Sequence, residues 1–138
     1  MSNVDVVRYI YEKFKQGDAA SVLAVFEPQI EFRLAEGHPY QPEGKPWFGG
    51  EEVTKHFFRK AGTEWENWNI IVDNILEAGD AVIVECRYSG AHKPSGRPLD
   101  LQVCHVWRLS NGKATSFHQY ADTARLQKVI GYVTAPRW

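Results

Sequence analysis

Residues that could transfer protons are concentrated in one segment near the C-terminal end, Leu101–Thr123, with the sequence LQVCHVWRLSNGKATSFHQYADT. Within it His105 alternates with apolar residues, so a strand here would turn its imidazole to the same face as Val103 and Trp107. An imidazole titrates near neutral pH and can donate a hydrogen bond to a developing enolate or shuttle a proton. The alternative is a core histidine that is satisfied by an ordinary hydrogen bond.

The turn at Asn111-Gly112 decides which residues share the face of His105. A two-residue type I′ turn would place His118 opposite His105. A three-residue loop with a bulge would instead place Gln119 and Phe117 on the face of His105, because a one-residue slip exchanges the two faces of a strand. We expect the bulged loop, since it buries Phe117 and leaves His118 outside.

Other polar residues have structural explanations. Asp122 stands where a strand gives way to a helix, and we expect it to cap that helix. Tyr9 and Tyr11 belong to the first helix, where one of them could aim its hydroxyl into a cavity, although packing is the simpler expectation. Glu31 and Arg33 alternate with an apolar residue on the first strand and could face either way.

The histidines and cysteines do not indicate a metal site or a cofactor. The five histidines are scattered without HxH or HExxH spacing. Cys86 and Cys104 are the only cysteines and form no CxxC motif, so we expect two buried free thiols and a cytoplasmic protein. We expect no metal and no cofactor. His56 and His92 are expected to face solvent.

The length and net charge of the chain limit the kinds of protein that it can be. With 138 residues, the chain is long enough for one domain spanning residues 1–138. The net charge of −1 gives no electrostatic reason to expect a nucleic-acid or anionic-membrane partner. No apolar run approaches the roughly 18 residues of a membrane span, and charged residues interrupt the apolar positions at the N-terminus.

The first half of the chain is predicted to be mainly helical. Apolar residues recur at three- and four-residue intervals over residues 3–16, and a short second helix runs from Asp18 to Phe26. A strand is predicted over residues 30–34. Prolines and glycines make residues 35–49 irregular, and a third helix is predicted from residue 51, with Gly62 beyond its end.

The second half changes to a period of two. Strands are predicted over residues 67–77, 81–90, 98–109 and 113–121, separated by turn-forming residues. A last helix is predicted over residues 122–132. Helices followed by an antiparallel meander indicate an α+β fold in which a curved antiparallel sheet wraps around the N-terminal helices.

Four segments, taken in order, resemble the SnoaL-like polyketide cyclases. They are YEKFKQGDAASVLAVF, FGGEEVTKHFF, HVWRLSNGKATSF and the YADT end. These cyclases belong to the ketosteroid isomerase and nuclear transport factor 2 superfamily. The resemblance implies a cone-shaped, cystatin-like α+β barrel of sheet and helices around an internal pocket.

The resemblance also assigns roles to positions in this pocket. His105 matches the inward histidine of the SnoaL-like cyclases. Fourteen positions later those cyclases carry an aspartate proposed as the general acid/base, where this chain has Gln119. A carboxamide can orient a substrate but cannot replace a carboxylate as a base. Ile10 and Leu34 stand at the tyrosine and base positions of ketosteroid isomerase, so we do not expect steroid isomerase activity.

The irregular loop over residues 35–49 commonly rims the pocket in this superfamily. Its aromatic residues could form a lid that selects an apolar ligand, and the alternative is plain loop packing. A pocket that reaches solvent past His38 or Trp47 would support ligand binding. The residues expected to bind ligand are Trp47, Tyr40, His38, Val103, Trp107, Phe117 and Tyr11.

Two functions fit these observations. In the first, the protein is a cofactor-independent isomerase, cyclase or dehydratase that acts on a small apolar carbonyl or hydroxyl compound, with His105 as acid/base or oxyanion donor and Gln119 orienting the substrate. In the second, it is a non-catalytic binding or association module that has lost the pocket carboxylate. In either case we expect a homodimer formed through the outer sheet face. This face carries Glu85, Arg87, Gln102, Arg108 and His118.

Overall fold

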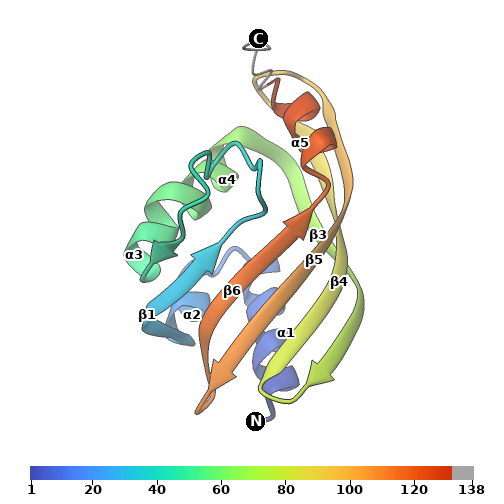
Figure 1. Ribbon diagram of the computed structural model, residues 1–138. Helices are drawn as coiled ribbons and strands as arrows, with labels where there is room; N and C mark the ends of the chain where they lie inside the picture. Colours follow the sequence, from blue (N-terminus) through green and yellow to red (C-terminus); the bar gives the residue numbers. More distant parts are fainter. Residues whose placement is uncertain (132–138) are drawn as a thin grey trace.

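The structure is an α+β fold in which one curved sheet carries helices on its inner face (Figure 1). The structure, a computed structural model, describes residues 1–131. Its elements, in chain order, are α1 Asn3–Lys15, α2 Ala19–Ala24, β1 Phe26–Arg33, β2 Trp47–Phe48, α3 Gly50–Val53, the π-helix Thr54–Phe58, α4 Arg59–Glu64, β3 Trp65–Ala78, β4 Ala81–His92, β5 Pro98–Ser110, β6 Lys113–Ala121 and α5 Thr123–Ile130. The last residue of the predicted C-terminal helix, Tyr132, lies outside the described residues.

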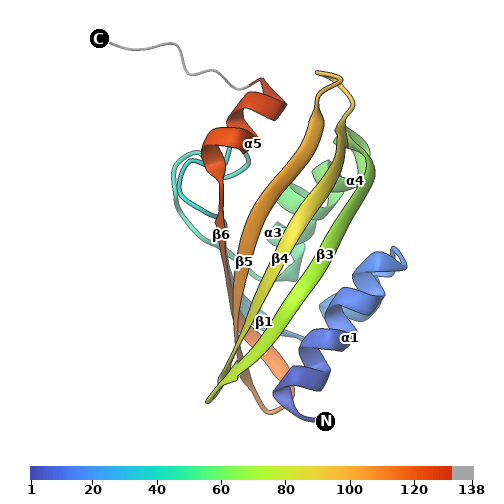
Figure 2. The same ribbon diagram turned by 90° about the vertical axis from the view of Figure 1, so that its right-hand side faces the viewer.

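The six strands form one sheet in the order β2-β1-β6-β5-β4-β3. The long strands β3 to β6 curve together, with α1, α3 and α4 on the same side of them (Figure 2). The expectation of a fully antiparallel sheet is wrong at one pair, because β1 runs parallel to β6. β1 also begins four residues before the predicted strand. It tolerates Pro28 because the pairing with β6 is interrupted between Phe26 and Glu31, where a missing N–H costs no ladder bond.

The helix α1 is fixed by its cap and by its apolar side. Ser2 and Asp5 form a capping box at its start, which satisfies two otherwise free backbone N–H groups. Val6, Val7 and Ile10 are buried against the sheet. The predicted helix over residues 3–16 is therefore confirmed to within one residue.

The third predicted helix is continuous but not regular. A π-helical turn, Thr54–Phe58, interrupts it between α3 and α4. Within this wider turn Phe57 is buried, and the adjacent Phe58 packs partly against the core. Gly62 was expected to lie beyond the helix, but it lies within α4, which continues to Glu64.

The β5–β6 hairpin places Phe117 and Gln119 on the expected face, but with a different turn and a different register. Asn111 and Gly112 have φ angles of 52° and 76°, and Ser110 pairs with Lys113, as in a two-residue type I′ turn. The expected three-residue loop is wrong. A bulge one pair further, where the register shifts between Arg108 and Leu109, turns Phe117 and Gln119 to the face of His105, as expected, although His105 pairs with Gln119 itself.

The pairing of β3 with β4 is distorted where β3 passes Gly90. The β3–β4 register is irregular between Glu66 and Asn69, and Asn67 there adopts a φ of 53°. Gly90 has a φ of 143°, and a Cβ at this position would lie 2.8 Å from the carbonyl oxygen of Glu66. Only glycine allows this close approach, which bends the two strands around the helices.

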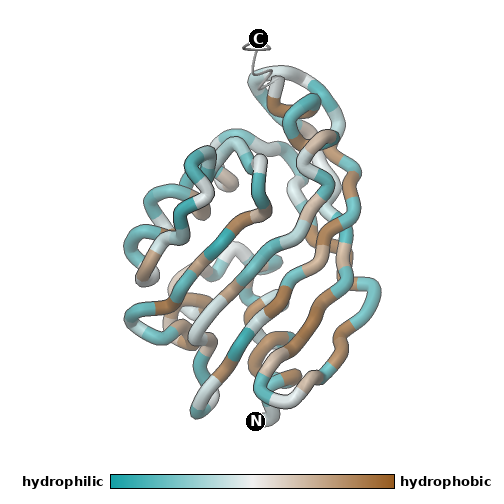
Figure 3. The backbone as a smooth tube through the Cα atoms, viewed as in Figure 1, coloured by the Kyte–Doolittle hydropathy of each residue, from teal (hydrophilic) through white to brown (hydrophobic). Residues whose placement is uncertain are grey.

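The core lies between the sheet and the helices. Along β5 the buried and exposed residues alternate, and the same alternation of apolar and polar residues is visible along the strands in Figure 3. The buried positions of β5 are Leu99, Leu101, Val103, His105, Trp107 and Leu109. Across residues 1–131, no helix has the length and apolar character needed to cross a membrane.

Candidate functional site

His105 lies in the core between two tyrosines that approach it from different elements. Its side chain is 2% exposed. The hydroxyl of Tyr11, from α1, lies 2.6 Å from Nδ1, and the hydroxyl of Tyr88, from β4, lies 2.6 Å from Nε2. Both ring nitrogens therefore have hydrogen-bonding partners, and both partners are phenols.

Each tyrosine is held in place by a second donor. The indole Nε1 of Trp107 donates to the hydroxyl of Tyr11 at 2.9 Å. The amide Nε2 of Gln119 donates to the hydroxyl of Tyr88 at 3.0 Å. The backbone N–H of Ala35 donates to Oε1 of Gln119 at 3.3 Å, and since that group can only donate, it fixes the orientation of the Gln119 amide.

This network contains one hydroxyl hydrogen more than it can use. A neutral imidazole offers one N–H and one lone pair, so one tyrosine donates to the ring of His105 and the other accepts from it. The accepting tyrosine already receives a hydrogen bond from Trp107 or Gln119. Its own hydroxyl hydrogen has no acceptor among these residues, and both Tyr11 and Tyr88 line the same cavity. The network can thus donate one hydrogen bond to a ligand.

Burial keeps these groups uncharged near neutral pH. Desolvation lowers the pKa of His105 to about 3. It also raises the pKa values of the Tyr11 and Tyr88 hydroxyls, and that of the Cys86 thiol to about 12. With its pKa lowered so far, the imidazole of His105 is a weak base at pH 7, but a neutral tyrosine hydroxyl in an apolar site is a good hydrogen-bond donor to an oxyanion.

The cavity beside this network is small and aromatic. It has a volume of about 30 Å³, roughly the space of one water molecule. Besides His105 and the two tyrosines, aromatic rings supply much of its wall. These are Phe14, Phe26, Phe32, Phe57, Phe58, Trp68, Trp107 and Phe117. A ligand larger than a few atoms can enter only if some of these side chains move.

A much larger cleft of about 730 Å³ opens to solvent between α1, α4 and β3. Tyr11, Phe14, Phe58, Trp68 and Ile70 line both this cleft and the inner cavity. The two spaces are therefore separated by a wall one side chain thick.

The comparisons with known proteins show the family and the fold of this chain. A family model described as a SnoaL-like domain matches residues 6–117. The chain belongs to the SnoaL-like family. A comparison with curated protein sequences found no match.

Several solved structures share the fold of this SnoaL-like chain. An NTF2-like protein from Burkholderia thailandensis E264 is 29% identical, with a TM-score of 0.87 over 94% of this chain and 98% of that one. An NTF2-like protein of unknown function from Burkholderia pseudomallei K96243 is 31% identical, with a TM-score of 0.84 over 98% of this chain and all of that one. A putative SnoaL-like polyketide cyclase from Jannaschia sp. CCS1 is 18% identical, with a TM-score of 0.81 over 97% and 93% of the two chains.

The structure brings most of the expected pocket residues of this SnoaL-like chain together. Tyr11, Trp107 and Phe117 line the inner cavity beside His105. Gln119 is fully buried and reaches His105 through Tyr88. Val103 is buried in the core but does not line this cavity.

Sequence reasoning missed Tyr88, the residue that links His105 to Gln119. Its signal was available, since Val82, Val84, Cys86 and Tyr88 alternate along β4 and are all buried. Alternation placed Tyr88 on the inner face, but its contact with His105 joins two strands and could not be inferred from either strand alone.

The loop over residues 35–49 does not form the expected entrance. His38 is only 4% exposed, and its Nδ1 accepts the backbone N–H of Tyr40. His38 and Tyr40 line a separate cavity of about 20 Å³, whereas Trp47 lines neither the inner cavity nor the outer cleft. The loop is pinned by Gln41, whose side chain bonds the backbone on both sides of Arg33.

A second polar cluster lies at the other end of the sheet, where His92 was expected to face solvent. That expectation is wrong, because His92 is 3% exposed and packs against Trp65. Its Nε2 lies 3.8 Å from Oε2 of Glu64, which also accepts the hydroxyl of Tyr40. Its Nδ1 lies 2.9 Å from Oγ of Ser95.

The remaining predictions concern structural roles. Asp122 caps α5 by accepting the N–H of Arg125, as expected. Glu31 and Arg33 form an ion pair at 3.3 Å on the partly exposed face of β1. His56, expected in solvent, is half-buried and stacks on Trp47.

Two further pairs of residues were predicted from the sequence. His118 and Tyr120 face outward, as expected, and stack on each other. Cys86 is a buried free thiol, whereas Cys104 is a free thiol that is only partly buried. Over residues 1–131 there is no cluster of three metal-binding side chains.

Proposed function

We propose that this protein binds a small, mostly apolar carbonyl compound inside the cone and polarises its oxygen with the hydroxyl of Tyr11 or Tyr88. The reaction class that this supports is cofactor-independent enolisation, as in an isomerase or cyclase. The tyrosine hydroxyl would donate a hydrogen bond to the carbonyl oxygen while a water molecule takes the proton from the adjacent carbon. In that reaction His105 fixes and tunes the donating tyrosine, and Gln119 holds Tyr88 in position.

The single observation that carries the proposal is the spare hydroxyl hydrogen. Four hydrogen bonds orient the two tyrosines and the imidazole, yet one hydroxyl keeps a hydrogen for an acceptor at the cavity wall. Such a preorganised, buried donor stabilises negative charge on an oxygen more strongly than water would. It is the arrangement that an enolate oxygen requires.

The first test compares two compounds of nearly the same shape, 1-tetralone and tetralin, which differ in a ketone oxygen. We expect the protein to bind 1-tetralone about fivefold or more tightly, as one hydrogen bond of about 1 kcal/mol would allow. The carbonyl stretching band of bound 1-tetralone should shift to lower wavenumber. Equal affinity for the two compounds, with no band shift, would contradict the proposed donor.

The second test asks whether binding leads to chemistry. In D₂O, an enzyme of this class should accelerate exchange of the hydrogens beside the carbonyl of 1-tetralone, observed by NMR. His105→Ala should remove the acceleration, whereas Trp47→Ala, outside the cavity, should keep it. Binding without accelerated exchange would assign the protein to the non-catalytic class.

One observation favours that second candidate, a non-catalytic binding or association module. The inner cavity holds only about 30 Å³, and the network around His105 has no carboxylate within residues 1–131. A module of this kind would still bind 1-tetralone in preference to tetralin. The exchange experiment therefore separates the two candidates.

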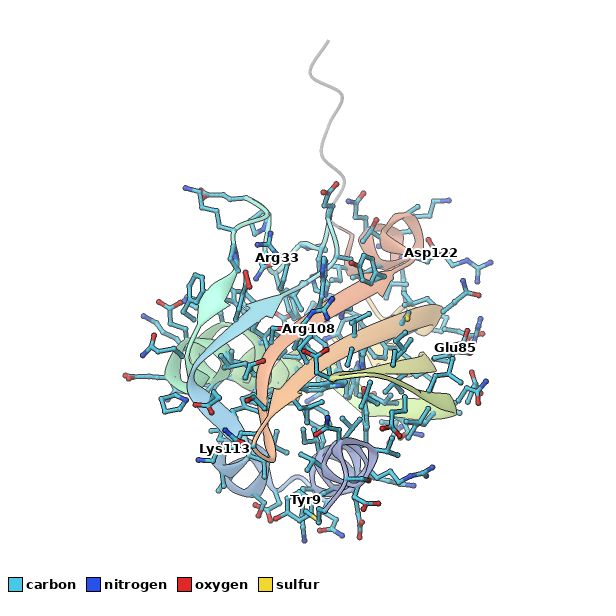
Figure 4. All side chains as sticks on the ribbon, turned by 60° about the horizontal axis from the view of Figure 1, so that its bottom comes forward. Tyr9, Arg33, Glu85, Arg108, Lys113 and Asp122 are labelled. Atoms are coloured by element: carbon cyan, nitrogen blue, oxygen red, sulfur yellow. The ribbon has the colours of Figure 1, made fainter. Side chains whose placement is uncertain are left out.

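We also propose that two copies associate through the outer sheet face. Glu85 and Arg108 lie on this face, away from the helices (Figure 4). Both are exposed, as is Tyr120 at 52%. Sedimentation at tens of micromolar should show a dimer, and Tyr120→Glu should convert it to a monomer. A monomeric wild-type protein would contradict the proposal.

A further inference from the structure

Three aromatic rings, beside Tyr11 and Ile70, form part of the wall between the outer cleft and the inner cavity. Phe14 comes from α1, Phe58 from the end of the π-helix, and Trp68 from β3. The ring centroid of Phe14 lies 5.5 Å from that of Phe58 and 5.3 Å from that of Trp68. All three side chains are half-buried and line both spaces, so they touch the cleft on one side and the cavity on the other.

The segments beside two of these rings are weakly anchored. The helix α4, which follows Phe58 directly, has no buried residue and contains Gly62. Trp68 lies within the irregular part of β3, between the pairs formed by Glu66 and Asn69, and β3 is the edge strand of the sheet. Segments with little burial and few ladder bonds open at low free-energy cost.

The opposite end of the cone is closed more firmly. There Gln41 accepts the N–H of Leu34 at 2.9 Å and donates to the carbonyl of Phe32 at 3.2 Å. Opening that end would break buried hydrogen bonds as well as apolar contacts. Separating Phe14, Phe58 and Trp68 costs apolar contacts alone.

We propose that the cleft between α1, α4 and β3 is the entrance to the ligand site, and that Phe14, Phe58 and Trp68 are a gate admitting a flat aromatic carbonyl compound. The proposal rests on the proposed function, because it assigns a route and a substrate class to the same site. A flat ring can replace the ring-to-ring contacts that its entry breaks, whereas a branched aliphatic chain cannot. The cleft volume of about 730 Å³ is in the range of small-molecule sites.

The gate is tested by association rates of 1-tetralone, followed by stopped-flow quenching of tryptophan fluorescence. Phe14→Ala should open the wall and speed association about tenfold. Gly62→Trp should obstruct the cleft and slow association about tenfold, since Gly62 lines the cleft and a Cβ there would have no atom within 4 Å. A rate increase in the first variant can arise from loosened packing, but a decrease in the second cannot.

Trp47→Ala is the matched control, because Trp47 is an aromatic residue of the other end that packs on Phe32 and Phe57. Its association rate should stay within twofold of the wild type. Faster association in Trp47→Ala, with no change in Phe14→Ala and Gly62→Trp, would overturn the gate and place the entrance at the loop over residues 35–49.

A measurement without ligand keeps the gate separate from the proposed function. The Sγ of Cys86 lies 3.9 Å from Nδ1 of His105 and reports on access to the interior. In a Cys104→Ser background, 4,4′-dithiodipyridine should label Cys86 about tenfold faster in Phe14→Ala and more slowly in Gly62→Trp. If 1-tetralone does not bind but this order is observed, the proposed function fails and the gate stands. If labelling does not follow this order, the gate fails.

Discussion

Two histidine–tyrosine clusters, one in the core around His105 and one at the end of β4 around His92, differ in the groups that face their ring nitrogens. At the inner cluster, His105 lies between Tyr11 and Tyr88, and every partner is an uncharged group that can donate. At the outer cluster, the hydroxyl of Ser95 donates to the carbonyl of Val129 at 2.6 Å, so it must accept the Nδ1–H of His92.

The other nitrogen of His92 faces a carboxylate. Glu64 already accepts the hydroxyl of Tyr40, and Tyr40 in turn accepts the indole N–H of Trp65. The inner cluster therefore has a hydrogen to donate, whereas the outer one sets Nε2 of His92 3.8 Å from the carboxylate oxygen Oε2 of Glu64. The inner cluster is therefore suited to bind an oxygen atom of a ligand, whereas the outer cluster joins α4, β4 and α5.

The largest effect expected is on stability when each histidine is removed. His105→Ala leaves the hydroxyls of Tyr11 and Tyr88 without their shared partner and creates a buried cavity. We expect the free energy of unfolding to fall by about 3 to 5 kcal/mol. His92 lies at the edge of the core, and His92→Ala should lower the free energy of unfolding by about 2 kcal/mol. Urea unfolding followed by fluorescence measures both.

His105→Gln is the matched control for the inner cluster, because an amide can both donate and accept. It should recover at least about 1 kcal/mol of the loss. Equal losses in the alanine variants of His105 and His92 would show that the two clusters do not differ in the way described.

The next effect is a loss of stability in acid. The pKa of His105 is about 3 in the folded protein against 6.5 for an ordinary histidine, and burial likewise lowers that of His38 to about 3. The unfolded chain therefore binds more protons between these values. The stability is complete above pH 6.5 and declines as pH falls toward 3. At pH 5 each histidine should account for about 2 kcal/mol.

Urea unfolding at pH 7 and pH 5 measures this loss, and the variants assign it. His105→Gln and His38→Gln should each reduce the difference between the two pH values by about half. A difference that neither variant changes would place the acid sensitivity in other groups.

The smallest effect expected concerns the link to α5. Ser95→Ala removes the acceptor of His92 Nδ1–H and the donor to Val129, and should cost about 1 kcal/mol. Ser110→Ala, at an exposed position beside the β5–β6 turn, should change the free energy of unfolding by less than about 0.5 kcal/mol. A loss of equal size in the two variants would mean that the Ser95 bonds do not stabilise the outer cluster.

The β5–β6 hairpin shows which features of the structure the local sequence pattern predicts and which it does not. Alternation along each strand predicted that His105 and Gln119 share a face, and their pairing in the sheet confirms it. The turn type was wrong, because Asn111 and Gly112 satisfy a type I′ turn and the bulge lies beyond them. Burial of Phe117 requires that its side chain share the face of His105, and several combinations of turn and bulge achieve this.

The sequence by itself determined the α+β class, the order of the elements, the inward direction of His105 and Gln119, and the absence of a carboxylate at position 119. These follow from periodicity, turn-forming residues and residue type, which act over short stretches of chain. Only the tertiary structure decided that Tyr11 and Tyr88 hold His105, that His92 is buried against Glu64, and that the wide cleft lies beside α1. Each of these joins residues from separate elements, and side-chain packing across the core, which no local pattern encodes, brings them together.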